Sequence, residues 1–419
     1  MTEPLLAVLA IVALAWAVLS DRLARSNITG PLVFVVAGFL LGNPEWGPLT
    51  VDVDTPSVHA IAELTLALLL FSDAARVNVA KLRQDIGVPV RLLGIGLMLS
   101  IVFGSVLAAW LFDDLGWALA CFVGAALAPT DAALSAQVIN DKNIPDRVRR
   151  SLNVESGLND GIATPIVMLA LAIAASQLGV VGEHNDGLGA LMELAVGVVV
   201  GMAVGLGSAK VISFSSRRGW LLHGGRRLAT LAAAVGSFAI AMSIGGNGFI
   251  AAFVAGVAFG ATIPRDVANV DEIAVLPELL GEVLALGVWF LFGAALVPVA
   301  FEYFSPATLL YAVLSLTVIR MLPVGLSLVG TTMDRETVLF IGWFGPRGLA
   351  SIVFALLAVE QLNEPSVVGQ AVSIVAFTVL LSVFAHGVSA GPLGRRYSRG
   401  HTARSLDGLG PQARKRSHE

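Results

Sequence analysis

The stretch from Glu155 to Asp160, with the sequence Glu-Ser-Gly-Leu-Asn-Asp, places two carboxylates inside a long apolar segment. Charge at that depth in a bilayer is costly and usually marks an ion pathway or a proton relay. At helical spacing Ser156 and Asp160 are four residues apart and share a face, while Glu155 and Asn159 share the neighbouring face. The spacing therefore predicts one face that binds an ion and a second face that braces it.

The composition is that of a polytopic membrane protein. Of the 419 residues, 56% are hydrophobic and 13% are charged, whereas a soluble domain is about half apolar and a quarter charged. The net charge of −4 carries little information by itself, because the distribution of charge matters more in membranes. A single cysteine, Cys121, excludes an intramolecular disulfide. The N-terminus has no basic region before its first apolar run, which argues against a cleaved signal peptide.

The apolar segments predict an all-α membrane protein with thirteen transmembrane helices. Each spanning helix needs about 20 mainly apolar residues, or fewer where neighbouring helices bury it. The predicted helices cover residues 5–20, 28–42, 57–75, 88–112, 116–139, 149–176, 188–212, 227–244, 247–263, 274–300, 306–329, 337–359 and 367–390. Residues 1–391 then form the transmembrane domain, and residues 392–419 form a short basic tail that we expect to be disordered and cytoplasmic.

The positions of the basic residues provide a check on this helix count. All lysines and arginines except Arg320 and Arg347 follow odd-numbered helices. The loops after even-numbered helices contain aspartates and glutamates but no lysine or arginine. The positive-inside rule then places the N-terminus outside and the C-terminus in the cytoplasm, in a multi-pass protein of the cell (inner) membrane. The two exceptions lie inside predicted helices 11 and 12, so each needs an acidic or carbonyl partner.

Two of the predicted helices are interrupted near their middle. Helix 5 contains Ala-Pro-Thr-Asp at 128–131, and helix 12 contains Phe-Gly-Pro-Arg-Gly at 344–348. Proline removes a backbone donor and glycine loosens the turn, so both helices should break within the membrane. The two helices are seven apart and enter from opposite sides, which predicts an inverted repeat of helices 1–6 and 8–13. Half-helix ends expose partial charges, which Asp131 and Arg347 could neutralise.

These motifs together resemble one family of membrane transporters. The stretches 128–135, 145–161 and 343–351, with Leu-Leu-Phe-Ser-Asp at 69–73, are similar to signatures of the cation:proton antiporter family, which includes the prokaryotic sodium/proton exchangers of the NhaP type. The resemblance covers helices 3 to 13. It implies an NhaA-like fold with broken helices 5 and 12, a homodimer, and a role in pH homeostasis.

The resemblance also assigns roles to individual residues. Its ion-coordinating positions fall on Asp160, Ser156, Thr130 and Asp131, and helix 3 contributes an acidic position that Asp73 occupies. The family pattern further pairs a helix 6 glutamate and asparagine with a helix 11 arginine. We expect four residues to give structural support: Glu155, Asn159, Arg320 and, in the second break, Arg347.

The residue types suggest how exchange would work. A sodium-sized cation prefers hard oxygen ligands, and we expect Na⁺ to bind at Asp160, Ser156, Thr130 and Asp73. Exchange follows if Asp160 holds either a proton or the cation but not both. At family level, asparagine at position 159 favours one proton per cation and electroneutral transport. We expect no cofactor beyond the transported Na⁺ (or Li⁺) and H⁺; the other expected partners are the lipid bilayer and a second copy, with no nucleic acid.

Three other functions remain open from the residues alone. A K⁺/H⁺ antiporter would use the same architecture. A cation channel would need a filter-like loop, and none is evident. An intramembrane hydrolase would need an H-E-x-x-H run or a Ser/His constellation, and neither is convincing, so we do not expect an enzyme.

Other ionisable residues in or near the predicted helices are expected to be structural. Glu63, Glu193, Glu278 and Glu282 lie nearer predicted helix ends, where snorkelling or capping is sufficient; Glu282 is the strongest candidate for an exception. The histidines, His386 among them, are expected in loops or near helix ends.

Overall fold

The computed structural model describes residues 3–49, 51, 55–77, 87–180, 187–264, 266–362 and 365–407. Every regular element in this part of the chain is a helix, which confirms the all-α fold class. Eight helices among the described residues are long and apolar enough to cross a membrane, and residues 30–42, 248–262 and 349–362 form shorter apolar helices. The count of thirteen spans and the internal inverted repeat stay predictions.

The first half of the chain begins with two apolar helices and ends with a long one. Its elements are α1 (Glu3–Arg25), α2 (Gly30–Gly42), α3 (Pro56–Arg76), α5 (Gly87–Arg91), the π-helical turn η1 (Leu92–Gly96), α6 (Leu97–Leu111), the short η2 (Asp113–Leu115), α7 (Gly116–Ala126), α8 (Ala136–Ile139), α9 (Asp146–Gln177) and α10 (Gly187–Arg217).

The second half contains the other broken helix and the longest helix. Its elements are α11 (His223–Ser243), α12 (Gly248–Thr262), α13 (Val270–Ile273), α14 (Val275–Leu291), the π-helical turn η3 (Phe292–Leu296), α15 (Val297–Glu302), α16 (Pro306–Leu316), α17 (Val318–Ser327), α18 (Arg335–Trp343), α19 (Leu349–Leu362) and α20 (Pro365–Asp407). Each of the thirteen predicted segments falls on one of these helices or on consecutive ones.

Both predicted helix breaks are present. Helix α7 ends at Ala126 and α8 begins only at Ala136, while α18 ends at Trp343 and α19 begins at Leu349. Each gap contains one proline, which has no backbone N–H to continue the helical hydrogen bonding. The prediction of two interrupted helices is therefore confirmed.

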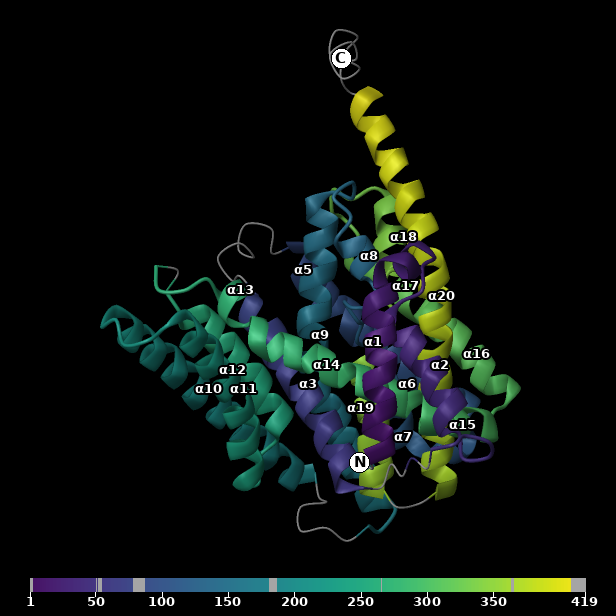
Figure 1. The fold of residues 1–419 in the computed structure, drawn as a ribbon. Helices are drawn as coiled ribbons and strands as arrows, with labels where there is room; N and C mark the ends of the chain where they lie inside the picture. Colours follow the sequence, from purple (N-terminus) through teal and green to yellow (C-terminus); the bar gives the residue numbers. More distant parts are fainter. Residues whose placement is uncertain are drawn as a thin grey trace.

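The helices form two groups that lie side by side. Figure 1 shows α10, α11 and α12 together at one side of the molecule, α3 and α14 next to them, and α6, α7, α15, α16 and α20 at the other side. Helix α12 packs directly on α3, where a Cβ at Gly256 or Gly260 would collide with the carbonyls of Phe71 and Ala75. This close approach turns the opposite face of α3, which carries Asp73, towards α9.

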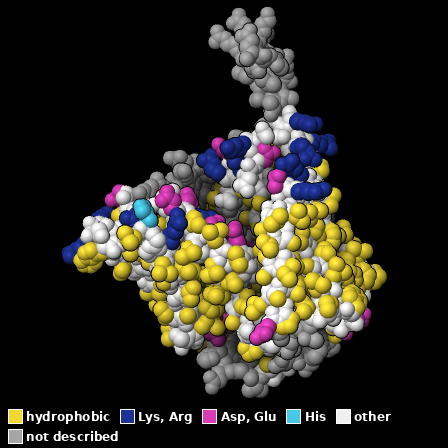
Figure 2. Space-filling view, viewed as in Figure 1, with side chains coloured by type: hydrophobic (Ala, Val, Ile, Leu, Met, Phe, Trp, Pro, Cys, Tyr) yellow, Lys and Arg dark blue, Asp and Glu magenta, His cyan; other side chains and the backbone are white. Residues whose placement is uncertain are grey.

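The surface is divided into an apolar band and a charged end. Figure 2 shows hydrophobic side chains over the middle of the molecule and most of the visible lysines and arginines gathered at the end from which α20 emerges. This is the pattern of a helical bundle whose sides contact lipid. Which side of the membrane that end faces stays a prediction.

The last helix corrects two expectations. Helix α20 continues to Asp407, so residues 392–407 are helical, and the prediction of disorder there is wrong; residues 408–419 lie outside the described part. Tyr397 is buried in this extension: its hydroxyl lies 2.7 Å from Thr337 Oγ1 and its ring stacks on Phe340. Because the helix is longer than expected, His386 lies in its interior rather than near an end.

Candidate ion-binding site

Hydrogen bonds of Asp131 join the two helix breaks. The Asp131 backbone N–H donates to the carbonyl oxygen of Pro346 at 2.8 Å. The Asp131 carboxylate in turn accepts from the backbone N–H of Leu349 at 3.0 Å, and from Ala133 and Leu134 of its own segment. Leu349 is the first residue of α19, so this carboxylate lies at the positive end of a half-helix.

The second break carries the complementary charge. Arg347 is fully buried, and its guanidinium donates to the carbonyl oxygens of Ala128, of Pro129 at 3.2 Å and of Ser315 at 3.4 Å. The carbonyls of Ala128 and Pro129 follow the C-terminal end of α7, where partial negative charge is exposed. The predicted neutralisation of half-helix ends by Asp131 and Arg347 therefore matches the geometry.

A short chain of hydrogen bonds joins the first break to α9. Asn159 Nδ2 donates to Thr130 Oγ1 at 2.8 Å, and Thr130 Oγ1 lies 3.0 Å from Ser156 Oγ. Since the Thr130 hydroxyl already accepts from Asn159, it can donate its own proton to Ser156. Both hydroxyls are buried, and they border the same cavity as Asp160.

The face of α9 that carries Glu155 and Asn159 holds a buried ion pair. Glu155 Oε1 lies 2.5 Å from Arg320 Nη1, and each side chain is only 2% exposed. Arg320 comes from α17, which belongs to predicted helix 11. The partner that the sequence demanded for this arginine is therefore the glutamate expected from the family resemblance.

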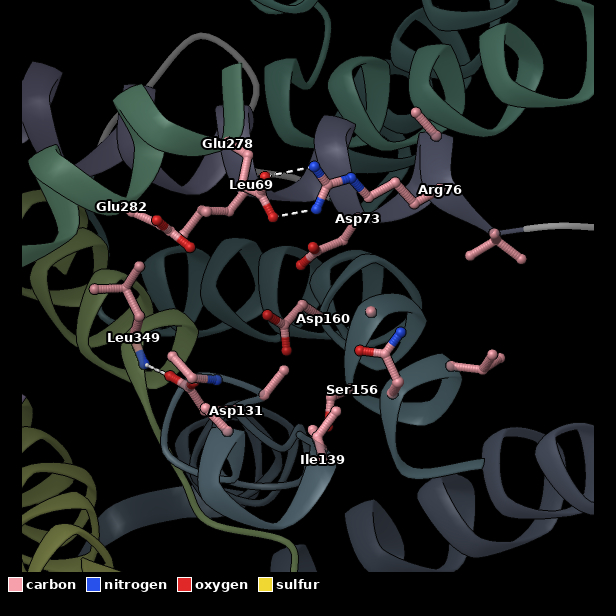
Figure 3. A pocket seen from close by; sticks show the side chains of 18 of the residues that line it. Leu69, Asp73, Arg76, Asp131, Ile139, Ser156, Asp160, Glu278, Glu282 and Leu349 are labelled. Atoms are coloured by element: carbon pink, nitrogen blue, oxygen red, sulfur yellow. Dashed lines mark hydrogen bonds and ion pairs between the residues drawn. The ribbon is translucent and has the colours of Figure 1, made fainter. Parts of the chain in front are cut away.

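Asp160 lies beside a cavity of about 1550 Å³. Figure 3 shows its carboxylate in the middle of the cavity wall, with Asp73 of α3 on one side and Asp131 and Ser156 on the other. The Asp160 carboxylate lies near enough to those of Asp131 and Asp73 for their negative charges to repel one another. Within the described residues its carboxylate makes no hydrogen bond or ion pair, so it is not held by a guanidinium.

The cavity reaches Asp160 from the basic end of the molecule. Its lining includes Arg147 and Arg150 from the first turns of α9 and Asp271 of α13. Apolar side chains, among them Leu66, Trp289 and Leu349, also line it. Water and ions can therefore reach the Asp160 carboxylate through this cavity.

One cluster in the cavity wall was missed by the sequence analysis. Arg76, at the end of α3, forms a bidentate ion pair with Glu278 of α14 (Figure 3). Glu282 lies one turn further along α14 and also lines the cavity. Glu278 lies in the first turn of α14, near a helix end as expected, and the contact that was missed is its ion pair with Arg76. The four-residue spacing of two acids in an apolar helix was the available signal, but the partner lies 202 positions away in the chain.

The described carboxylates are not arranged as a cluster of metal ligands. Among the described residues, no three histidine, cysteine, aspartate or glutamate side chains come together closely enough to hold a metal ion. Hydroxyl, backbone and water oxygens could complete the coordination of a cation beside Asp160, and Ser156 and Thr130 contribute hydroxyls to the wall.

Comparison with known proteins identifies the family. Residues 7–396 match the family described as sodium/hydrogen exchanger, transmembrane. The chain belongs to this family. The fold agrees: the structure of the sodium proton antiporter MjNhaP1 from Methanocaldococcus jannaschii at pH 8 is similar with a TM-score of 0.73, at 19% identity, over 92% of this chain and 100% of that one. The exchanger family and its fold are those of secondary transporters, not enzymes.

The curated relatives of this exchanger carry two kinds of name. The "K(+)/H(+) antiporter NhaP" of Alkalimonas amylolytica is 28% identical over 80% of this chain, and NhaP2 of Shewanella oneidensis, with the same activity in its name, is 26% identical over 81%. The chain spans only 57% and 58% of their lengths. The "Na(+)/H(+) antiporter NhaP" of Pseudomonas aeruginosa is 27% identical over 82% of both chains.

Proposed function

We propose that this exchanger transports Na⁺ or Li⁺ in one direction and H⁺ in the other, with one cation exchanged for one proton. The observation that carries the proposal is the Asp160 carboxylate, which borders a solvent-accessible cavity and has no ion-pair partner among the described residues. A carboxylate in this position can bind a proton or a cation in turn, whereas one held by an arginine could do neither.

The surrounding groups suit a small monovalent cation. Ser156 and Thr130 offer hydroxyl oxygens, and Asp73 offers a second carboxylate on the facing helix. Oxygen ligands of this kind bind hard cations. The hydrogen bond from Asn159 leaves the Thr130 hydroxyl oriented towards Ser156, so a lone pair of Ser156 can point at a cation in the cavity.

Coupling follows from the cost of charge in the membrane. Asp160 would be neutral with a proton bound, and largely neutralised with a cation bound, so either loaded form can move past the barrier between the two sides. The empty, negatively charged form is too costly to move. Alternating access of this kind places the binding site at the junction of broken helices, and here α7, α8, α18 and α19 meet beside it.

Potassium is the second candidate. Relatives that share 26 to 28% identity with this chain are named K⁺/H⁺ antiporters, while a relative of more similar length is named a Na⁺/H⁺ antiporter. Carboxylate and hydroxyl oxygens alone do not choose between these cations. We place the charged end in the cytoplasm of a cell membrane and propose a homodimer, as expected from the family resemblance.

The deciding experiment is exchange in proteoliposomes. A pH-sensitive dye would report proton movement after addition of Na⁺, Li⁺ or K⁺, for the wild type and for Asp160→Asn. We expect Na⁺ and Li⁺ to give saturable signals that disappear in the variant. Asp113→Asn, which alters an exposed acid on η2, is the matched control and should retain exchange. A K⁺ signal alone would support the second candidate, and activity in Asp160→Asn would overturn the site.

A further inference from the structure

Helix α20 packs against the break between α18 and α19 with two buried polar residues. Ser382 and His386 are one turn apart in α20, and their exposed fractions are 0% and 1%. Neither residue borders the cavity, and the exchange mechanism above does not use them. Burying a hydroxyl and an imidazole is costly unless both are hydrogen-bonded, so their partners indicate what they do.

Their partners are the backbone groups on either side of the break. The Arg347 backbone N–H donates to Ser382 Oγ at 2.7 Å, and Ser382 Oγ lies 3.2 Å from His386 Nδ1. On the other side of the ring, His386 Nε2 lies 2.9 Å from the carbonyl oxygen of Trp343. The imidazole also stacks on the Trp343 ring, with centroids 5.2 Å apart.

The directions of these bonds depend on which nitrogen of His386 carries the proton. Ser382 Oγ accepts from Arg347, so its own proton is available for His386 Nδ1. His386 Nε2 then carries the ring proton and donates it to Trp343. The Nε2 proton is assigned from the contact with the Trp343 carbonyl, while Nδ1 also lies 3.0 Å from the backbone carbonyl oxygen of Ser382.

These hydrogen bonds are needed because the break leaves backbone groups outside any helix. Trp343 is the last residue of α18, and Arg347 lies two residues before α19. Backbone polar groups at membrane depth must be satisfied by protein where water is excluded. The Trp343 carbonyl also accepts from the Gly345 N–H at 2.8 Å, so the turn is fixed from inside by Gly345 and from outside by His386.

The fixed segment also holds the other break. The Pro346 carbonyl accepts from the Asp131 N–H, and the Arg347 side chain binds the carbonyls of Ala128 and Pro129. Thr130 lies between these contacts. We propose that Ser382 and His386 are positioning residues that fix the backbone of residues 343–347, and through it hold Thr130 and Asp131 in place beside Asp160. This inference rests on the proposed function for its effect on transport.

The first test is independent of transport. Hydrogen–deuterium exchange of the detergent-solubilised full chain would be compared at residues 343–349 for the wild type, Ser382→Ala and His386→Phe. We expect about tenfold faster exchange in both variants, because each loses a bond that holds the segment. Ser373→Ala is the matched control: Ser373 is equally buried in α20, but its hydroxyl donates to Ala300 at 3.0 Å, away from the break.

The second test separates positioning from general stability. In proteoliposomes we expect Ser382→Ala and His386→Phe to raise the cation KM about tenfold, while Ser373→Ala leaves KM unchanged although its melting temperature also falls. The double variant should be no worse than either single one, since both bonds act on the same segment. His386→Gln, whose amide can still donate to the Trp343 carbonyl, should retain a near-normal KM.

Two results would overturn the proposal. One is exchange at residues 343–349 that is unchanged in Ser382→Ala and His386→Phe, or that rises equally in Ser373→Ala. The other is a fall in melting temperature with an unchanged cation KM, which would make the two residues structural only. If the wild type transports no cation, the proposed function fails, but the hydrogen exchange comparison still decides whether α20 fixes the break.

Discussion

Asp131 and Arg347 each bind the backbone of the other's broken helix. The Asp131 carboxylate accepts from the N–H of Leu349, at the start of α19, while the Arg347 guanidinium donates to the carbonyl of Ala128, two residues after the end of α7. Each charge therefore faces a half-helix end of opposite sign. The two interruptions satisfy each other, so they should move or distort as one unit.

This relationship predicts an intolerant glycine. Gly348 packs against the Asp131 carboxylate, and a Cβ at Gly348 would overlap it. We expect Gly348→Ala to push Asp131 off the N-terminus of α19, lowering the melting temperature and abolishing exchange. Loss of a capping carboxylate alone costs about 0.5–2 kcal/mol.

A second glycine provides the control. Gly325 of α17 has no atoms within 4 Å of the place its Cβ would occupy, so Gly325→Ala should be neutral or slightly stabilising. Thermal unfolding in detergent and dye-reported exchange would compare the two variants. Equal melting temperatures and equal exchange rates in Gly348→Ala and Gly325→Ala would contradict the contact between Asp131 and the start of α19.

The local features of this site could be predicted from the sequence. Pro129 and Pro346 lack the backbone N–H that would continue a helix, and each lies close to a charged residue in an apolar segment. Proline alone is not sufficient, since Pro165, Pro323 and Pro392 lie inside helices. Helical spacing alone placed Ser156 and Asp160 on one face of α9. These signals act within a few residues, so the sequence is sufficient to find them.

The parts that were missed depend on contacts between distant segments. The bond between Arg76 and Glu278 joins α3 to α14, and only the close packing of α12, α3 and α14 brings them together. His386 was misplaced because α20 extends well beyond its apolar segment, where Tyr397 packs on α18. Neither hydropathy nor residue spacing carries information about such packing.

Breaking the buried ion pair should be severely destabilising. Glu155 and Arg320 are 2% exposed and 2.5 Å apart. Glu155→Ala would leave the guanidinium buried without its partner, which typically costs about 3–5 kcal/mol. The double variant Glu155→Leu with Arg320→Met removes both charges and should recover much of the melting temperature. A double variant that is as unstable as Glu155→Ala would show that the ion pair contributes more stability than the cost of burying its two charges.

The two hydroxyls beside Asp160 should have separable effects. Ser156→Ala removes a possible cation ligand, and we expect the cation KM to rise about tenfold with little loss of stability. Thr130→Val removes a hydroxyl that also accepts from the buried Asn159 amide, so it should raise KM and also cost about 1–3 kcal/mol of stability. Melting temperatures and KM values measured together would test this, and equal melting temperatures would contradict it.

The Arg76–Glu278 pair should tune the electrostatics of the cavity. Glu278→Gln would leave the Arg76 charge without its partner on the same helix turn that carries Asp73, and this positive charge would repel an entering cation. We expect a higher cation KM, an effect that weakens at high ionic strength because the pair is partly exposed. The double variant Arg76→Gln with Glu278→Gln should return KM towards the wild-type value. No change of KM in Glu278→Gln would mean that the pair only joins α3 to α14.

Competition for a single carboxylate predicts a particular dependence on pH. If H⁺ and the cation exclude each other at Asp160, lowering the pH on the cation side should raise the apparent cation KM and leave the maximal rate at saturating cation unchanged. Sodium titrations in proteoliposomes at several pH values would measure this. With one proton exchanged per cation, an imposed potassium diffusion potential with valinomycin should not alter the rate of sodium exchange. A maximal rate that falls with pH at an unchanged KM would indicate protonation of some group other than Asp160, and a voltage-dependent rate would indicate a different stoichiometry.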